Sequence, residues 1–345
     1  MSIQNVTFKR KNWTVPPVPT LPPRILVDLR TDCNLKCPMC IVHGDPENPI
    51  LKDFLKKDMS LENARKILDQ VMTAKPMVGP SLWSEPLMAK NFKEHVVQIK
   101  ERGMAISINT NGLLLRPELA EFFVEVKLDS ICFSIDAVTV ETLYKVRGVK
   151  TLPKLHKAVE MMLEARGDNL LPRIGVSFTV QPTNEHECEQ FIAEWTPKVD
   201  FVRIGELFEQ GHFPSVAVQE ERHACPSLYS TMAIHANGNV SYCCLDGFGE
   251  TSLGNVFESS VEDVWNGEKF NEVRLHHENG EWDKVPFCKN CDRWATYDVE
   301  ERVENGILIR RSAEFTYYNK IERLSSWTAQ LMCGLHASQV TTVQS

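Results

Sequence analysis

Three closely spaced cysteines are the first feature of this sequence that points to chemistry. The stretch VDLRTDCNLKCPMC places Cys33, Cys37 and Cys40 in one loop after a short apolar run. Three thiolates within eight residues can wrap one iron-sulfur cubane and leave its fourth iron open. A structural zinc site closes its tetrahedron with a fourth Cys or His, and His43 offers that alternative. An open iron would accept a substrate or cofactor as its ligand.

A second set of four cysteines lies further along the chain. Cys225 and Cys243 are followed, after a long gap, by Cys288 and Cys291 in the sequence CKNC. Four thiolates can saturate a cluster, so this cluster need not bind a substrate through iron. Asn237-Gly238 predicts a hairpin turn that brings the first two cysteines together. A structural zinc ribbon is the alternative that the spacing leaves open.

The composition limits the class of protein. The chain has 345 residues, 43% of them hydrophobic, which suits one large and one small domain. Its net charge of -8 disfavours nucleic acid as a partner. Residues 1–23 lack the apolar run of a signal peptide, and no stretch of 18 apolar residues occurs. We therefore expect a cytoplasmic protein with no membrane partner, whose eleven cysteines serve metal binding or catalysis.

Alternating apolar runs and amphipathic stretches must position these cysteines. Helices are predicted after Ser60, a good N-cap, and from Pro117 and Pro153, which suit a first helical turn. The alternation predicts a parallel sheet of six strands that curls into a partial (βα)6 barrel of the TIM type, with polar residues at the strand ends lining the site. The predicted strands cover residues 25–29, 78–83, 105–109, 130–135, 174–180 and 201–204.

The same patterns divide the chain into four segments. Proline-rich residues 1–23 are expected to form an extended arm on the surface, followed by the α/β barrel over residues 24–215. Residues 216–300 are expected to form a small cysteine-rich domain. Residues 301–345 are a C-terminal extension with one possible strand, GILIRRSAEFTYY.

The first cysteine motif resembles the CxxxCxxC signature of the radical S-adenosylmethionine (SAM) superfamily. The resemblance implies a [4Fe-4S] cluster on Cys33, Cys37 and Cys40 that chelates S-adenosylmethionine, whose reductive cleavage releases a 5′-deoxyadenosyl radical. It also implies a flavodoxin or ferredoxin type electron donor.

Further motifs resemble the same superfamily at successive strand ends. Ser84-Glu85-Pro86 is similar to the GGEP motif, which implies that Glu85 binds the amino group of the cofactor, although serine replaces a glycine. Asn109 and Asn111 in INTNG match positions that contact the ribose or shape the pocket, and Ser134 and Asp136 in FSIDA resemble the SxDG motif. Arg147 could meet a carboxylate of the cofactor or substrate, or form a surface ion pair.

The distal cysteines resemble the SPASM and twitch domains that follow radical SAM barrels. Full SPASM domains carry seven cysteines and two auxiliary clusters. After Cys291 this chain offers only Cys333, so the resemblance implies one auxiliary [4Fe-4S] cluster on Cys225, Cys243, Cys288 and Cys291. This layout is similar to the aminocyclitol dehydrogenase and sugar epimerase members.

The resemblance predicts an oxidoreductase or epimerase acting on a small hydroxylated molecule of the sugar or aminocyclitol type. Oxidation needs a base for the hydroxyl proton and an auxiliary cluster as electron acceptor. The candidates for the base or for substrate binding are Gln181, Asn184, Glu206, Gln210 and Asp246. Epimerisation needs a thiol that returns hydrogen, and Cys244 is the candidate, whereas Cys132, Cys188 and Cys333 are expected to be buried.

Two other functions stay open. Many SPASM proteins modify ribosomal peptides, but such maturases often carry an N-terminal recognition module, for which the 24 residues before the first strand leave little room. A non-enzymatic scaffold with two zinc ions would require zinc without iron or sulfide.

Overall fold

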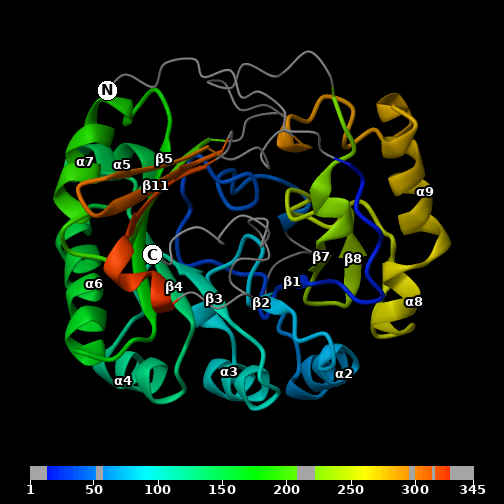
Figure 1. Ribbon diagram of the computed structural model, residues 1–345, viewed down its shortest axis with the longest axis horizontal. Helices are drawn as coiled ribbons and strands as arrows, with labels where there is room; N and C mark the ends of the chain where they lie inside the picture. The colour runs from blue at the N-terminus through cyan, green and yellow to red at the C-terminus, as the bar shows by residue number, and fades with distance from the viewer. Residues whose placement is uncertain (1–13, 52–56, 208–221, 295–299, 313–314, 327–345) are drawn as a thin grey trace.

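The parallel strands at the centre of the molecule form a curved wall with helices on its outside (Figure 1). The computed structural model describes residues 14–51, 57–207, 222–294, 300–312 and 315–326. The wall contains β1 (Arg24–Val27), β2 (Met77–Gly79), β3 (Ser107–Thr110), β4 (Ser130–Ser134), β5 (Arg173–Val180) and β6 (Phe201–Glu206). β1 pairs with β2, and β3 to β6 pair in order, all in parallel. A bridge between Val78 and Ile106 joins the two groups, which confirms the predicted partial barrel.

Helices cover the outer face of these strands. They are α2 (Leu61–Val71), α3 (Phe92–Glu101), α4 (Pro117–Glu125), α5 (Val140–Arg147), α6 (Leu152–Arg166) and α7 (Cys188–Trp195). Ser60 caps α2 as predicted, since its hydroxyl accepts the Asn63 N–H. Short 3-10 turns follow several strands and loops, namely η1 (Pro86–Met88), η2 (Glu185–Glu187), η3 (Pro226–Tyr229), η4 (Trp282–Lys284) and η6 (Ile321–Ser326).

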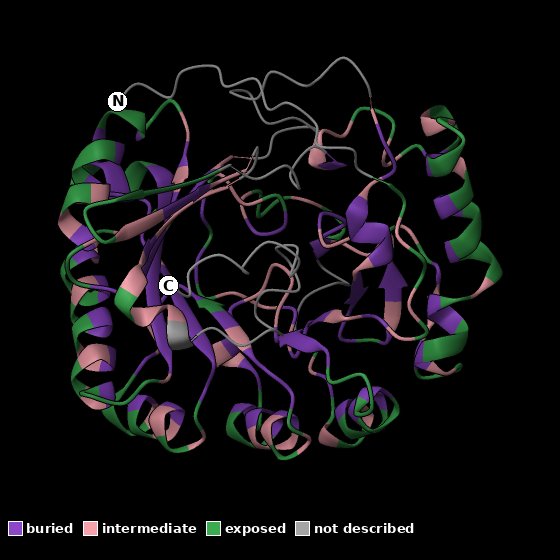
Figure 2. Ribbon diagram, viewed as in Figure 1, coloured by how far each residue is buried: buried purple, intermediate pink, exposed green. Residues whose placement is uncertain are grey.

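The two faces of the wall differ in chemistry because side chains alternate along a strand. Phe133, Val176 and Val202 belong to the apolar core shared with the helices. Ser134 and Arg203 lie in register with Ser177 between them, on the opposite, inner face. Figure 2 shows the strands buried and the helices exposed on their outer sides. None of the helices in the described part of the chain is long and apolar enough to cross a membrane.

A second group of strands extends the wall at its β1 edge. β7 (Thr231–Ile234) pairs in parallel with β1, and β8 (Asn239–Ser241) and β9 (Gly254–Asn255) follow in antiparallel order. The predicted hairpin is confirmed, but only Gly238, at φ +83°, takes the left-handed conformation expected of the Asn237-Gly238 pair. Helices α8 (Val261–Trp265) and α9 (Glu268–Glu278) complete this side.

The proline-rich arm lies against α8 where it is described. Trp265 Nε1 donates to the Pro19 carbonyl at 2.8 Å, and Asn266 Nδ2 donates to the Thr20 carbonyl at 2.9 Å. Residues 14–23 thus contact the α8 region, the surface arm over residues 1–23 stays a prediction, and residues 1–13 lie outside the described part.

The C-terminal extension adds three strands at the opposite edge. β10 (Glu300–Glu304), β11 (Ile307–Arg311) and β12 (Phe315–Lys320) form an antiparallel meander, and β12 pairs antiparallel with β6. The prediction of one strand over residues 306–318 was wrong. Ser312 N–H donates to the Phe315 carbonyl at 2.7 Å and closes a turn that reverses the chain.

Candidate functional site

The loop after β1 gathers the first three cysteines. Cys37 is buried, and Cys33 and Cys40 are half-buried. The Leu35 N–H points at Cys33 Sγ at 3.5 Å, and the His43 N–H points at Cys40 Sγ at 3.3 Å. A side chain on Gly44 would place Cβ 2.5 Å from the Cys40 carbonyl oxygen, so this tight turn needs glycine.

The chemistry of these thiols fits an iron-sulfur cluster. Burial raises the pKa of Cys33 to about 12, with further raising by Glu85 and by the charges of Cys37 and Cys40. Thiolates in such a place need a cationic partner, which iron provides, together with N–H donors to sulfur. Within the described ranges, no three Cys, His, Asp or Glu side chains converge closely enough for a single metal ion.

Glu85 is buried beside this loop, in the segment after β2, where it caps η1. Its carboxylate accepts from Thr110 Oγ1 and from the Asn111 N–H, both at 2.7 Å, and from the Leu87 N–H at 3.2 Å. The Glu85 N–H donates to the Asp32 carbonyl. Glu85 therefore ties the ends of β2 and β3 to the cysteine loop, and its predicted contact with the cofactor stays a prediction.

The serine that replaces the motif glycine has a defined partner. Ser84 Oγ donates to Asp28 Oδ1 at 3.0 Å, and the Leu82 N–H donates to the same oxygen at 2.7 Å. Asp28, directly after β1, is buried. Its position at the end of an apolar strand was a signal for it in the sequence, but our prediction did not include it.

Of the polar residues predicted at the ends of β3 and β4, Asn111 contacts the cysteine loop. Asn111 Nδ2 donates to Asn34 Oδ1 at 2.7 Å and lies 4.0 Å from Cys33 Sγ. Asn109 is exposed on β3, and Ser134 is half-buried at the last position of β4.

Asp136 and Arg147 form a buried ion pair rather than a surface pair. Arg147 Nε and Nη2 contact Asp136 Oδ2 at 2.8 and 2.5 Å, and Arg147 Nη1 lies 3.9 Å from Cys37 Sγ. Nearby Asp136 and Cys37 raise the pKa of Arg147, outweighing the opposing effect of burial. A fixed positive charge therefore lies beside the first cysteine site, where it suits a carboxylate or a thiolate.

The four distal cysteines come from three segments: the start of η3, the loop after β8 and the loop after η4. Arg222 Nη2 donates to the Cys288 carbonyl at 2.6 Å and connects two of these segments. Burial raises the pKa of Cys243, and the charges of Cys288 and Cys291 raise it further. Burial likewise raises the pKa of Cys288, and the charge of Cys225 is the second-largest cause that raises it. Cys288 and Cys291 thus lie near both Cys225 and Cys243. Backbone N–H groups point at Cys243 and Cys291, which fits a second cluster.

The loop that follows Cys243 packs against the first site. Trp83 Nε1, adjacent to the Ser84-Glu85 motif, donates to the Cys244 carbonyl at 2.6 Å. A side chain on Gly247 would meet Val42 Cγ2 at 2.4 Å and Trp83 Cδ1 at 3.1 Å. Val42 belongs to the first cysteine loop, so the segments that carry the two cysteine sets touch.

Asp246, a predicted catalytic residue, is buried inside this loop. Its carboxylate accepts from the Glu250 N–H at 2.9 Å, from the Thr251 N–H at 2.8 Å and from Thr251 Oγ1 at 2.6 Å. These bonds hold the loop that presents Cys243 and half-buried Cys244.

The other predicted candidates are spread over the strand ends. Gln181 lies 3.0 Å from Met39 sulfur in the first cysteine loop, and Asn184 is buried with its amide bonded to Asp136 and Thr179 carbonyls. Glu206 ends β6 and is half-buried. Cys132 and Cys188 are buried as expected, whereas Gln210 and Cys333 lie outside the described residues.

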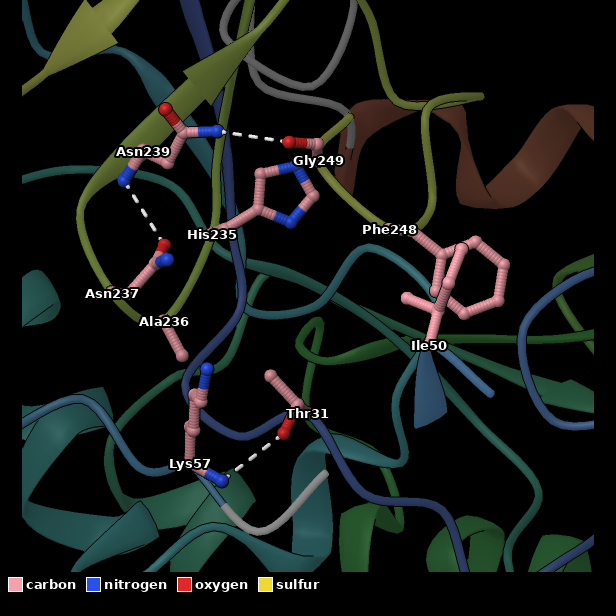
Figure 3. Close-up of a pocket in the computed structure, with 9 residues that line it drawn as sticks. All are labelled: Thr31, Ile50, Lys57, His235, Ala236, Asn237, Asn239, Phe248 and Gly249. Atoms are coloured by element: carbon pink, nitrogen blue, oxygen red, sulfur yellow. Dashed lines mark hydrogen bonds between the residues drawn. The ribbon is translucent and has the colours of Figure 1, made fainter. Parts of the chain in front are cut away.

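A pocket of about 190 Å³ lies where the loops after β1 and β7 meet (Figure 3). The segment after β7 contributes His235, Phe248 and Gly249, and segments after β1 contribute Thr31, Ile50 and Lys57. Lys57 N–H donates to Thr31 Oγ1 at 3.1 Å. The pocket therefore marks a second place where the barrel loops meet the hairpin that leads to Cys243.

Comparisons with known proteins agree with this geometry. Residues 29–194 match the Radical SAM superfamily, and residues 225–292 match SPASM, an iron-sulfur cluster-binding domain. A tungsten-containing aldehyde ferredoxin oxidoreductase cofactor-modifying protein of Pyrococcus furiosus is 25% identical over 331 residues, covering 80% of this chain and 90% of that protein.

Two solved structures share the fold. BtrN in complex with AdoMet and 2-DOIA is 16% identical, with a TM-score of 0.51 over 79% of this chain and 93% of BtrN. Streptococcus suis SuiB bound to precursor peptide SuiA is 16% identical, with a TM-score of 0.59 over 80% of this chain and 71% of SuiB. These domains imply a [4Fe-4S] cluster with S-adenosylmethionine and an auxiliary iron-sulfur cluster. The chain therefore carries a Radical SAM domain, over residues 29–194, that is followed by a SPASM iron-sulfur cluster-binding domain.

Proposed function

We propose that this enzyme oxidises an alcohol carbon of a small hydroxylated substrate, of the sugar or aminocyclitol type, to a carbonyl. The observation that carries the proposal is the contact between the loop after Cys243 and the first cysteine loop, through Trp83 and Gly247. A second cluster next to the first can receive an electron from a substrate held between them. The fold is shared by BtrN, whose structure contains 2-DOIA, and by SuiB, whose structure contains a precursor peptide, so a peptide substrate is tested alongside the small molecules.

The cofactors and the protein divide the work. When bound, the cluster with S-adenosylmethionine supplies a radical that abstracts hydrogen, and the auxiliary cluster supplies an acceptor for the second electron. A flavodoxin or ferredoxin type donor reduces the cluster that carries S-adenosylmethionine. Cys33, Cys37 and Cys40 hold the first cluster, and Cys225, Cys243, Cys288 and Cys291 hold the second. The chain's own task is to position the substrate and exclude water.

Oxidation of an alcohol removes one hydrogen atom, one proton and one electron from the substrate. The proton goes to a base. Glu206, at the carboxyl end of β6, was predicted for this role, but it lies in register with Val180 of the apolar core, so the alternation that puts Arg203 on the inner face puts Glu206 on the outer one. Asp246 is assigned to loop structure because its carboxylate already accepts three bonds. Glu85, Asn109, Asn111, Ser134 and Arg147 are proposed to hold the cofactor.

Epimerisation is the second candidate function. Cys244 is half-buried, and its backbone is held by Trp83 beside the Ser84-Glu85 motif. A thiol in this loop could return hydrogen to the opposite face of the substrate carbon.

One experiment separates the two reactions. The reconstituted enzyme is incubated anaerobically in deuterated water with reductant, S-adenosylmethionine and a panel of sugars and aminocyclitols. We expect a new carbonyl, with one 5′-deoxyadenosine per product and no deuterium in retained C–H bonds. Deuterium incorporation that is lost in Cys244→Ala, but kept in the control Cys188→Ala, would instead establish epimerisation. Turnover of a peptide alone would reject both.

A further inference from the structure

The C-terminal meander places charged side chains on the inner face of the barrel wall. In register, Arg310 of β11 lies opposite Tyr317 of β12, which lies opposite Arg203 of β6. Arg203 in turn lies opposite Ser177 of β5, and Ser177 opposite Ser134 of β4. Residues in register point to the same side of a sheet. This row therefore shares the inner face with Ser134.

The outer face of the same strands confirms this orientation. Val202 belongs to the apolar core beneath the helices and lies in register with Tyr318, which lies opposite Ile309. Tyr318 packs against that core, and Ile309 is buried. Because alternate residues point to opposite faces, Arg203, Tyr317 and Arg310 cannot share this apolar side.

Arg310 is a buried cation on the inner face, and its ion pair among the described residues is made with a partly exposed glutamate. Only 2% of the Arg310 side chain is exposed, and its Nη1 and Nη2 have no hydrogen-bond partner within the described part of the chain. Its ion pair runs from Nε to Glu301 Oε1 at 3.1 Å, and Glu301 is 31% exposed. A buried guanidinium without hydrogen bonds is unfavourable, and burial lowers the pKa of Arg310.

Arg203 adds a second cation to this face. It stacks on Phe315 at 5.3 Å and bonds to the Tyr317 hydroxyl, and among the described residues no carboxylate lies within ion-pair distance of it. Neighbouring strands are about 4.8 Å apart, so Arg203 and Arg310, two strands apart, have Cα atoms about 10 Å from each other. Two arginine side chains can close on one group across that distance.

Guanidinium groups match carboxylate and phosphate oxygens in geometry and charge. We propose that Arg203 and Arg310, with the hydroxyl of Tyr317, bind an anionic group, a carboxylate or phosphate, of the small-molecule substrate. This inference rests on the proposed function, because it takes the bound anion to be part of the small-molecule substrate. Ser134 lies two strands from Arg203, so the anion would be bound about 10 Å from the expected cofactor side. The site belongs to neither matched domain, since β6, β11 and β12 lie outside both matched ranges.

The test measures binding of inorganic phosphate and of citrate to the reconstituted protein, by calorimetry and by thermal unfolding at constant ionic strength. We expect saturable stabilisation by at least one of the two anions, and the one that binds identifies the chemical class. Arg310→Met and Arg203→Met should weaken binding at least tenfold. Arg310→Lys, which keeps the charge without the planar fork, should weaken it several-fold, and the exposed control Arg302→Gln should leave it unchanged.

Unfolding without anion separates a binding role from a packing role. If Arg310 binds an external anion, its buried charge is uncompensated when no anion is present, and this destabilises the free protein. Arg310→Met removes that charge, so the variant should unfold at the same or a higher temperature than the wild type. A lower unfolding temperature with anion binding intact would overturn the inference, as would no response of the wild type to either anion. Cleavage of S-adenosylmethionine without substrate, by the wild type and by the exposed control Arg302→Gln, reports separately on the proposed function.

Discussion

At the scale of single residues, Asp28 links the barrel to the hairpin that leads to Cys243. Its carboxylate accepts from Leu82 and Ser84 of the loop after β2, and its other oxygen lies 3.9 Å from Nδ1 of His235, directly after β7. Burial is the main cause that raises the pKa of Asp28 from 3.8 to about 7, and burial lowers the pKa of His235. Near neutral pH, Asp28 is therefore divided between its protonated and ionised forms, while the neutral imidazole of His235 is favoured.

Asp28→Asn should therefore change how stability depends on pH. With a raised pKa in the folded state, the favourable contribution of protonated Asp28 is complete below pH 4 and is lost as the pH rises through about 7. Asparagine keeps the accepting oxygen and never ionises. We expect the unfolding temperature of the variant, relative to wild type, to rise between pH 5.5 and pH 8, by a free energy of about 2 kcal/mol.

Thermal unfolding of both proteins under anaerobic conditions measures this effect. Asp69→Asn, in an exposed pair with Arg102, is the matched control and should show no such rise. A difference between Asp28→Asn and wild type that is independent of pH would contradict the assignment.

At the scale of elements, the docking of the loop after Cys243 depends on Gly247. Its Cβ position lies 2.4 Å from Val42 Cγ2, so a larger residue must separate the two cysteine loops. Gly247→Val should destabilise the protein by about 1–3 kcal/mol, as overpacking does.

Thermal unfolding with iron analysis tests this prediction. Gly306→Asn, in the turn between β10 and β11 where no atom lies within 4 Å of the Cβ position, should change stability little. Equal unfolding temperatures for Gly247→Val and wild type would show that the loops do not depend on this contact.

The individual strands were predicted from the sequence more completely than the pairing between them. The six barrel strands and α2 were predicted because apolar periodicity and caps such as Ser60 are local signals. The pairing of β7 with β1 and of β12 with β6 was not predicted, because these partners are distant in sequence and no local pattern encodes their contact. The turn at Ser312 was missed inside a segment rich in strand-forming residues.

The candidate site divides in the same way. The cysteines and the polar residues after strands, such as Glu85 and Asn111, were found because their types and spacing carry chemistry. The loop role of Asp246 and the contact of Trp83 with Cys244 follow from tertiary packing. Arg203 and Arg310 escaped notice because each is a single charge in a strand, and only the register brings them together.

At the scale of the whole molecule, both edges of the barrel wall are extended. At the β1 edge, β7 and β8 lead to the loop that carries Cys243, and at the β6 edge, β12 and β11 add Tyr317 and Arg310. One extension provides the second cysteine site and the other the proposed anion site. The core barrel between them holds the first cysteine site.

Two separate clusters on one chain predict the numbers of iron and sulfide ions that each chain binds. The reconstituted wild type should contain about eight irons and eight sulfides. Replacing Cys33, Cys37 and Cys40 by alanine should leave about four irons, as should Cys288→Ala with Cys291→Ala. About four irons in the wild type would remove the auxiliary [4Fe-4S] cluster from the account.

The most direct test of the central claim is the formation of 5′-deoxyadenosine from S-adenosylmethionine by the reduced protein. The account predicts that wild type and the Cys288→Ala, Cys291→Ala variant form it, whereas the variant without Cys33, Cys37 and Cys40 forms none. Undiminished 5′-deoxyadenosine formation by that triple variant would contradict the assignment of the first cysteine loop as the radical-generating centre.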